Sequence, residues 1–151
     1  MNKEFIVRGK RVDNGKWVQG GTLIQTEIAT YVLPSGADVQ IEKDNMQNIA
    51  YIQGVLVAEK TASPYTGILD KHKNKIFVGD VVQIGNQIGE VCFRYGTFGI
   101  RFKGAIDFFR FKFDDNFISF MDLLYFFMCE QNICDKVEII GNKWEDFNLL
   151  N

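Results

Sequence analysis

Few residues of this sequence are of types that carry catalytic or metal chemistry. The chain has three cysteines, Cys92, Cys129 and Cys134, and one histidine, His72. Thiolates and an imidazole are ligands for zinc, and a cysteine beside a histidine can act as a nucleophile. The cysteines form no Cys-x-x-Cys pair, however, and His72 lies in a polar run with nothing near it in sequence to orient it. We therefore expect free thiols, a turn histidine, no metal and no cofactor.

Two aspartates, Asp70 and Asp80, could form a pair of carboxylates for acid–base catalysis. Each stands at a turn signal, where an aspartate side chain accepts hydrogen bonds from backbone N–H groups. The glycine-rich run at 85–89 lacks the Lys-Ser/Thr pair and the strand–loop–helix setting of a phosphate-binding loop. We expect local structural roles for the aspartates and a hairpin with a bend for the glycines, and hence no catalytic residue.

Basic residues alternate with aromatic residues in two places. Such clusters can bind single-stranded nucleic acid by stacking and phosphate contact, whereas lysines along a strand edge also protect that edge from aggregation. If residues 71–75 were extended, their three lysines would lie on one side. Both interpretations stay open. The candidate contacts are Arg8, Lys10, Arg11 and Trp17 in the first cluster, and Tyr65, Lys71, Lys73 and Lys75 in the second.

A short helix is predicted over residues 119–130. Ser119 with Asp122 three residues later is an aspartate version of a capping box. Apolar residues then follow at helical spacing, which predicts an amphipathic helix. Its apolar face either packs in the core or forms an interface between copies of the chain. The candidate interface residues are Phe117, Phe120, Leu124 and Phe127.

The remaining elements are strands and tight turns, among them a hairpin at Asn14-Gly15 followed by a returning strand over residues 17–24, so we predict a mainly-β fold. Ser63-Pro64 marks a break between an N-terminal β module over 1–63 and a second module over 64–151. The second module has the turn Gly79-Asp80, a tight hairpin signal, and a long strand with an internal glycine at Gly89. This order of turns and strands is typical of a small SH3-like barrel carrying one short C-terminal helix. The two modules could also share a core and form one compact unit.

The composition excludes several classes of function. The chain of 151 residues has a net charge of −2, with 17 basic and 19 acidic residues, so it lacks the basic excess of proteins that wrap duplex DNA. An odd number of cysteines is typical of a reducing compartment. No leader sequence or membrane-spanning stretch is evident. We expect a cytoplasmic protein with no membrane contact.

Short segments along the chain form one ordered set, namely residues 8–11, 13–18, 65–71, 76–82, 96–100, 138–142 and 144–145. In this order the segments resemble the YopX family. The resemblance implies a mostly β fold with an SH3-like barrel portion and a setting in phages and prophages of low-GC Gram-positive bacteria. It implies no catalytic residues, since the molecular function of that family is not established. His72-Lys73 stands where the family often has Asn-Gly.

These patterns favour a non-enzymatic phage accessory protein that binds a host or phage macromolecule, with a protein favoured over nucleic acid. We also expect a homo-oligomer, because the apolar content is large for so small a chain. A module that binds single-stranded nucleic acid is the second hypothesis, and an enzyme is the third. The family resemblance alone implies that the protein acts in an infected or lysogenic bacterial cell.

Overall fold

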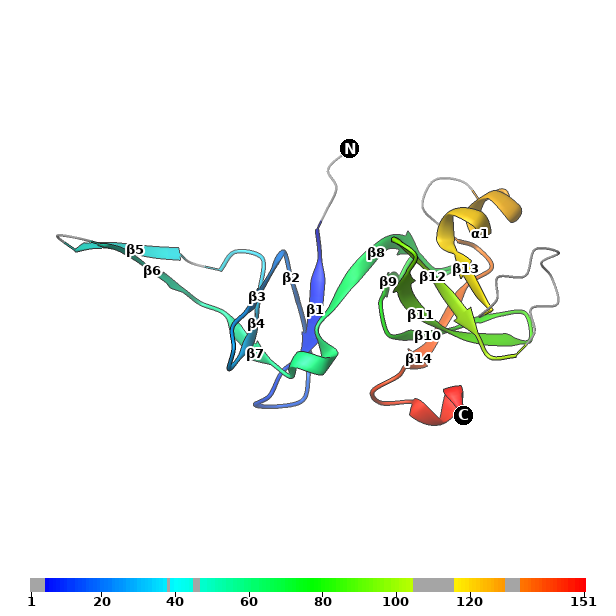
Figure 1. The fold of residues 1–151 in the computed structure, drawn as a ribbon, viewed down its shortest axis with the longest axis horizontal. Coiled ribbons are helices and arrows are strands. Elements are labelled where there is room, and N and C mark those ends of the chain that lie inside the picture. The colour runs from blue at the N-terminus through cyan, green and yellow to red at the C-terminus, as the bar shows by residue number, and fades with distance from the viewer. Residues whose placement is uncertain (1–4, 38, 45–46, 105–115, 130–133) are drawn as a thin grey trace. The chain divides into compact units, whose positions relative to one another are not determined.

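The structure is a computed structural model that describes residues 5–37, 39–44, 47–104, 116–129 and 134–151 (Figure 1). The described residues form mostly β-strands with a single α-helix, which confirms the predicted mainly-β class. The strands are β1 Val7–Lys10, β2 Trp17–Gly20, β3 Thr22–Gln25, β4 Thr30–Leu33, β5 Val39–Asp44, β6 Gln47–Ile52, β7 Val55–Val57, β8 Ser63–Leu69, β9 Lys75–Phe77, β10 Asp80–Ile84, β11 Gln87–Arg94, β12 Thr97–Phe102, β13 Phe117–Ser119 and β14 Glu138–Asn142. The helices are α1 Phe120–Phe126 and the 3₁₀ turns η1 Glu59–Thr61 and η2 Phe147–Leu150.

The chain divides into two compact units, Met1–Pro64 and Tyr65–Asn151. The break predicted at Ser63-Pro64 falls at this division. The division falls inside strand β8, which begins at Ser63. Ser63 and Pro64 pair with β1, whereas Tyr65 and Leu69 pair with β9. A proline is tolerated in such a strand only where its missing N–H is not needed for pairing.

The N-terminal unit is built from antiparallel pairs of short strands. β1 and β2 form the hairpin predicted at Asn14-Gly15, where Gly15 takes a left-handed φ of 69°. The strand predicted over 17–24 is divided into β2 and β3 at Gly21. Gly20, the last residue of β2, packs closely against the next strand, since a Cβ there would lie 1.9 Å from the carbonyl oxygen of Leu33. β3, β4 and β7 form a second sheet, and β5 pairs with β6 as a two-stranded ribbon. The small core of this unit is Val7, Val32 and Val57.

The second unit contains a five-stranded antiparallel sheet in the order β13-β12-β11-β10-β14. The late strand β14 pairs with β10, with a register shift between Val81 and Val82. The described strands do not close into a barrel, so the predicted SH3-like closure is not found. Gly89 allows β11 to pack closely against β12, since a Cβ there would lie 2.5 Å from the Cγ2 of Ile100.

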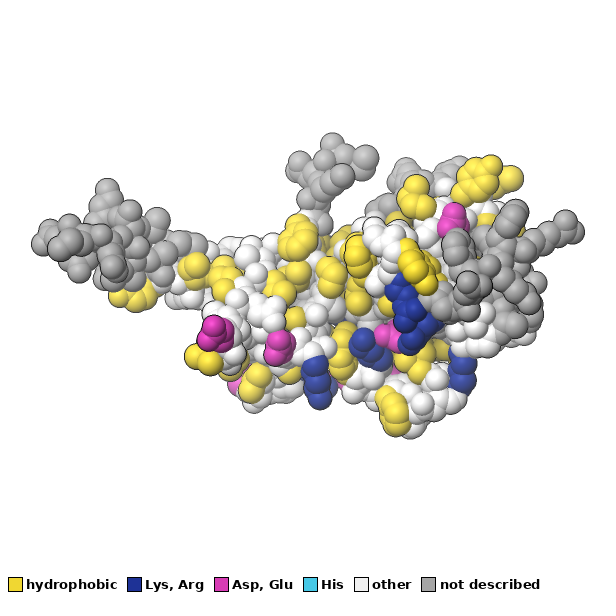
Figure 2. All heavy atoms as spheres, viewed as in Figure 1, with side chains coloured by type: hydrophobic (Ala, Val, Ile, Leu, Met, Phe, Trp, Pro, Cys, Tyr) yellow, Lys and Arg dark blue, Asp and Glu magenta, His cyan; other side chains and the backbone are white. Residues whose placement is uncertain are grey.

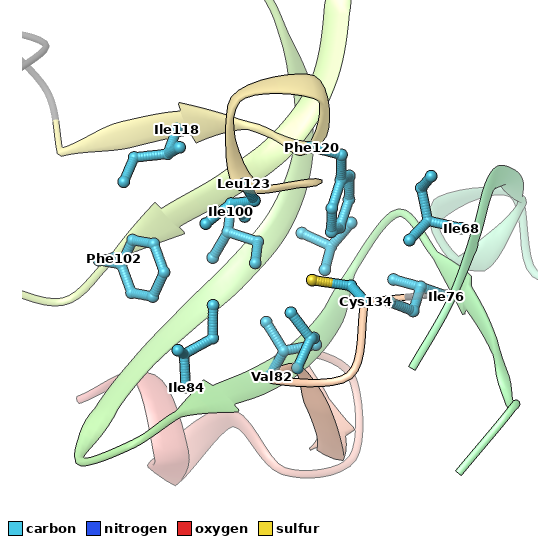
Figure 3. Close-up of a cluster of buried hydrophobic side chains, with 12 residues drawn as sticks. Ile68, Ile76, Val82, Ile84, Ile100, Phe102, Ile118, Phe120, Leu123 and Cys134 are labelled. Atoms are coloured by element: carbon cyan, nitrogen blue, oxygen red, sulfur yellow. The ribbon is translucent and has the colours of Figure 1, made fainter. Parts of the chain in front are cut away.

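The main core lies in this second unit, between the sheet and the elements that cover it. Side chains from β8, β9 and α1 point into the same cluster as those of the sheet (Figure 3). Burial of this many aliphatic and aromatic groups supplies most of the stabilisation of the unit. The buried members are Ile68, Ile76, Val82, Ile84, Val91, Ile100, Phe102, Ile118, Phe120, Leu123, Cys134 and Val137.

Helix α1 starts where the sequence predicts it and ends earlier. The Ser119 hydroxyl accepts a hydrogen bond from the backbone N–H of Asp122 at 3.1 Å, which confirms the capping prediction. The helix ends at Phe126, and the predicted end, residue 130, lies outside the described residues. Met128 N donates to Tyr125 O and Cys129 N donates to Leu124 O, a Schellman motif. Met128 takes the left-handed position, with φ 50°, that usually belongs to glycine.

Candidate functional site

The two aspartates proposed as paired carboxylates each hold a turn. The Asp70 side chain is fully buried and accepts hydrogen bonds from the backbone N–H of His72 at 2.9 Å, of Asn74 at 2.8 Å and of Ile139 at 3.3 Å. Asp80 Oδ2 accepts from the backbone N–H of Phe77 at 2.8 Å. Their predicted local roles are therefore confirmed, and the Asp70 turn also binds the C-terminal strand β14.

A charged cluster lies beside that turn. Glu138, the first residue of β14, forms an ion pair with Lys71 at 2.6 Å and contacts the His72 ring nitrogen Nε2 at 3.3 Å. Hydrogen bonds from Lys71 and then His72 lower the pKa of the Glu138 carboxyl. The backbone N–H of Lys71 also donates to the carbonyl of Val137 at 2.9 Å. These polar contacts join the turn after β8 to the start of β14, two segments that are distant in the sequence.

A third contact joins the same two segments. Gly79 has φ 86°, and the ring of Trp144 lies against it. The backbone N–H of Lys143 donates to the carbonyl of Gly79 at 2.9 Å. The segments that carry the family resemblance, 65–82 and 138–145, are thus neighbours in space, and what they share is a structural junction.

The first basic–aromatic cluster lies on the β1–β2 hairpin. Its register places Lys10 opposite Trp17, and Arg8 stacks over the Trp17 ring at 4.7 Å from the ring centroid. Arg8 Nε also donates to the Ser63 hydroxyl at 3.3 Å. Arg11 forms an ion pair with Asp13 at 2.6 Å, and hydrogen bonding to that carboxylate raises the pKa of the guanidinium. The structure brings Arg8, Lys10 and Trp17 together, with Arg11 engaged by an acid.

The second basic–aromatic cluster is not the straight edge that residues 71–75 would form if they were extended. The backbone N–H of Lys73 donates to the carbonyl of Asp70, and Lys73 has a left-handed φ of 65°, so the chain turns here. Lys71 is paired with Glu138. Lys75 lies over the Tyr65 ring at 5.8 Å. The three lysines therefore do not form one face, because the Asp70 carboxylate selects a turn over an extended strand.

The four residues proposed as an oligomer interface pack inside the chain. Phe117 and Phe120 are 2% and 3% exposed, and Leu124 and Phe127 pack against the main core. The opposite side of the helix segment is the exposed one. We call it the outer α1 surface, and hydrophobic side chains are visible over α1 in Figure 2. It consists of Met121, Tyr125, Phe126 and Met128.

The sequence did contain a signal for this second face. Met121, Tyr125 and Met128 follow i, i+4, i+7 spacing, parallel to the buried set Phe120, Leu124 and Phe127. Periodicity shows that both sides are apolar without showing which side the core covers.

A hollow of about 280 Å³ lies between the first turn of α1 and the tip of the β11–β12 hairpin. Tyr95 stands at that tip with a left-handed φ of 52°, and its ring meets the Phe117 ring edge-on at a centroid distance of 5.9 Å. Thr97, Ser119 and Asp122 complete the lining. The Ser119 hydroxyl donates to Asp122 Oδ2 at 2.6 Å, so this carboxylate is engaged in the helix cap.

Histidine, cysteine and carboxylate side chains do not gather into a candidate metal site in the described part of the chain. Within it, no group of three or more His, Cys, Asp or Glu side chains is placed to hold a metal ion. None of Cys92, Cys129 and Cys134 is part of a disulfide bond. Among the helices described, none has the length and apolar character needed to cross a bilayer.

The fold is that of a mainly-β protein of two units. In the second unit, the C-terminal segment 138–145 contacts the turns at Asp70 and Gly79. The chain belongs to the YopX family, since the family model described as YopX protein matches residues 8–151, nearly the whole chain. This confirms the resemblance seen in the sequence. No curated protein matches the chain.

Proposed function

We propose that this chain is a non-catalytic accessory protein of a phage or prophage that binds another protein, of host or phage origin, in the bacterial cytoplasm. The binding site is the outer α1 surface. The observation that carries the proposal is the exposure of its large apolar side chains: Tyr125 is 88% exposed and Met128 is 87% exposed. Clusters of large apolar side chains at the surface are typical of protein-binding sites.

Backbone strain beside this surface supports the proposal. Met128 and Tyr95 are both bulky residues in left-handed conformations, which cost about 1–2 kcal/mol each relative to ordinary backbone. Such strain is concentrated at functional positions, where it holds a side chain in a required direction. At both positions the side chain held in this way is apolar and exposed.

The chemistry of the surface indicates an apolar partner surface. Methionine side chains are flexible and polarizable, and they adapt to irregular apolar partners. Aromatic residues supply most of the binding energy in protein interfaces when they are fully desolvated. Met121 and Tyr125 lie four residues apart in α1, and Met128 follows just beyond the end of the helix, so the outer α1 surface combines both features. A homo-oligomer, expected from the sequence, would use the same surface.

The nucleic-acid alternative has less support from the described contacts. Arg8 covers one face of the Trp17 ring, and Arg11 and Lys71 are paired with acids. An enzyme has the least support, since Asp70 and Asp80 are both used by backbone N–H groups. These arguments favour protein binding without metal, cofactor or catalytic residue.

The test is capture of a partner from a lysate of infected or lysogenic cells, followed by titration of the purified partner against variants. Tyr125→Asp and Met128→Asp should each weaken binding at least tenfold, because a charge would be desolvated in the interface. The matched control is Ile28→Asp, at a residue that is 95% exposed in the other unit and should bind as the wild type does. A partner indifferent to both α1 variants would contradict the proposed site.

Two further measurements separate the alternatives. Anisotropy of a labelled single-stranded oligonucleotide at low and moderate salt tests nucleic-acid binding, which falls steeply with salt. Affinity lost on Arg8→Ala or Trp17→Ala would replace the proposal with the nucleic-acid hypothesis. Light scattering tests the oligomer, and an assembly that Tyr125→Asp dissociates would identify a second copy as the occupant of the surface.

A further inference from the structure

Two cysteine side chains meet just beyond the end of α1. The Sγ atoms of Cys129 and Cys134 lie 4.0 Å apart. Cys129 is partly exposed and Cys134 is fully buried, with its sulfur pointing into the main core (Figure 3). The pair thus consists of one thiol that a small reagent can reach and one that only Cys129 can reach.

We propose that Cys129 and Cys134 form a thiol–disulfide exchange site that reacts with a low-molecular-weight disulfide such as oxidised glutathione. In the first step the Cys129 thiolate attacks one sulfur of that disulfide, forms a mixed disulfide and releases one thiol. In the second step the Cys134 thiolate attacks Cys129 Sγ and releases the second thiol. The two cysteines are oxidised to a disulfide while one small disulfide is reduced to two thiols.

The geometry is suited to the second step. A disulfide bond is about 2.05 Å long, so closure needs an approach of about 2 Å, within the range of side-chain rotation. Cys129 Sγ also lies 3.4 Å from Asp135 Oδ1, a hydrogen bond from thiol to carboxylate that directs the sulfur towards this turn. Because both cysteines are on the same chain, the resolving step does not depend on protein concentration.

The buried thiol becomes easier to deprotonate as the reaction proceeds. Burial raises the pKa of Cys134 to about 12, with further contributions from the charge and the hydrogen bond of Cys129. Once Cys129 is in a mixed disulfide, it has neither a thiolate charge nor a thiol hydrogen bond. Two of the causes that oppose a Cys134 thiolate are thereby removed at the step that requires it. The mixed disulfide itself therefore favours closure.

Closure would couple redox state to the rest of the unit. Cys134 donates its backbone N–H to the carbonyl of Leu69 at 2.9 Å, and Val137 O accepts from Lys71 N. A bond to Cys129 would therefore link the C-terminal end of α1 to the turn that follows β8. The oxidised protein would hold the outer α1 surface more rigidly than the reduced protein.

The experiment treats the reduced full chain with oxidised glutathione, then counts thiols after denaturation and maps the peptides. We expect the count to fall from three to one, with Cys92 remaining and a Cys129–Cys134 crosslink. The Cys92→Ser control should react at the same rate and end with no thiol. Cys134→Ser should stop at glutathione bound to Cys129, and Cys134→Ala repeats this test with an apolar side chain in case serine disturbs the core. A wild-type chain that keeps glutathione on Cys129, or keeps three thiols, would overturn the proposal.

Discussion

The indole ring of Trp144 occupies the space where a side chain at position 79 would stand. A Cβ built on Gly79 would lie 2.2 Å from Cη2 of Trp144, far inside van der Waals contact. Gly79 also has φ 86°, a conformation that L-residues rarely adopt. The C-terminal Trp144 and the turn before β10 therefore fit together only when residue 79 is glycine.

Gly79→Ala should lower the free energy of unfolding by about 2–5 kcal/mol, combining left-handed strain with overpacking. Chemical denaturation measures the change. The matched control is Gly85→Ala, where φ is 59° and no atom lies within 4 Å, so only the strain remains, about 1–2 kcal/mol. If overpacking is the cause, Gly79→Ala should cost less in a Trp144→Leu background. Equal costs in both backgrounds would exclude the contact as the reason.

Asp70→Ala should destabilise the second unit by about 2–4 kcal/mol, because several buried N–H groups would lose their acceptor. Asp70→Asn keeps one oxygen and should fall between the wild type and the alanine variant. Asp13→Ala provides the control, since its ion pair with Arg11 is exposed and worth under about 1 kcal/mol. Thermal and urea unfolding of the three variants measure these changes in stability. Equal destabilisation by Asp13→Ala and Asp70→Ala would show that the buried hydrogen bonds of Asp70 are not the cause.

Met128→Gly should stabilise the fold by about 0.5–1 kcal/mol, because glycine adopts the left-handed end of a Schellman motif without strain. Met121→Gly, on the same exposed surface but inside the helix, should instead destabilise by about 0.5–1 kcal/mol. Urea midpoints of the two variants therefore move in opposite directions. Both variants remove an apolar side chain from the outer α1 surface, so both should weaken partner binding, which separates binding from stability.

The ion pair of Glu138 with Lys71 should make stability depend on acid pH. The pKa of Glu138 is lowered from the ordinary value of 4.5, so folding favours its charged form. Its contribution is complete above pH 4.5 and is lost as the pH falls through the lowered folded value. The difference in unfolding midpoint between wild type and Glu138→Gln should therefore be present at pH 7 and vanish in stronger acid. Lys71→Met should shrink this pH dependence, and a difference that persists at low pH would argue against the ion pair.

Local signals in the sequence predicted local structure well. The Asn14-Gly15 hairpin, the capping of α1 by Ser119 and the turn roles of Asp70 and Asp80 each depend on residues within a few positions of one another. The sequence could not show how distant strands pair, so the barrel prediction missed the open sheet in which β14 borders β10. Pairing of distant strands depends on the whole chain, and turn residues do not encode it.

Two details of the candidate surfaces differ from the structure for a similar reason. An alternation of lysines at 71, 73 and 75 predicts one face only if the backbone is extended, and the Asp70 hydrogen bonds make it turn. For α1, two apolar faces of equal spacing compete, and the contact with Ile100 and Ile118 decides which is buried. No sequence signal marks Met128 as left-handed, because glycine or asparagine normally takes that position.

The pairing of β10 with β14 has a consequence for synthesis on the ribosome. The last residue of β10 is 84 and the last residue of β14 is 142, so 58 residues must be added before the partner strand is complete. At roughly 5–20 residues per second this takes about 3–12 s, during which the nascent β10 has an open edge. A chaperone that binds extended apolar segments would find its target in this window, and translation pauses between codons 84 and 142 should increase aggregation of the newly made chain.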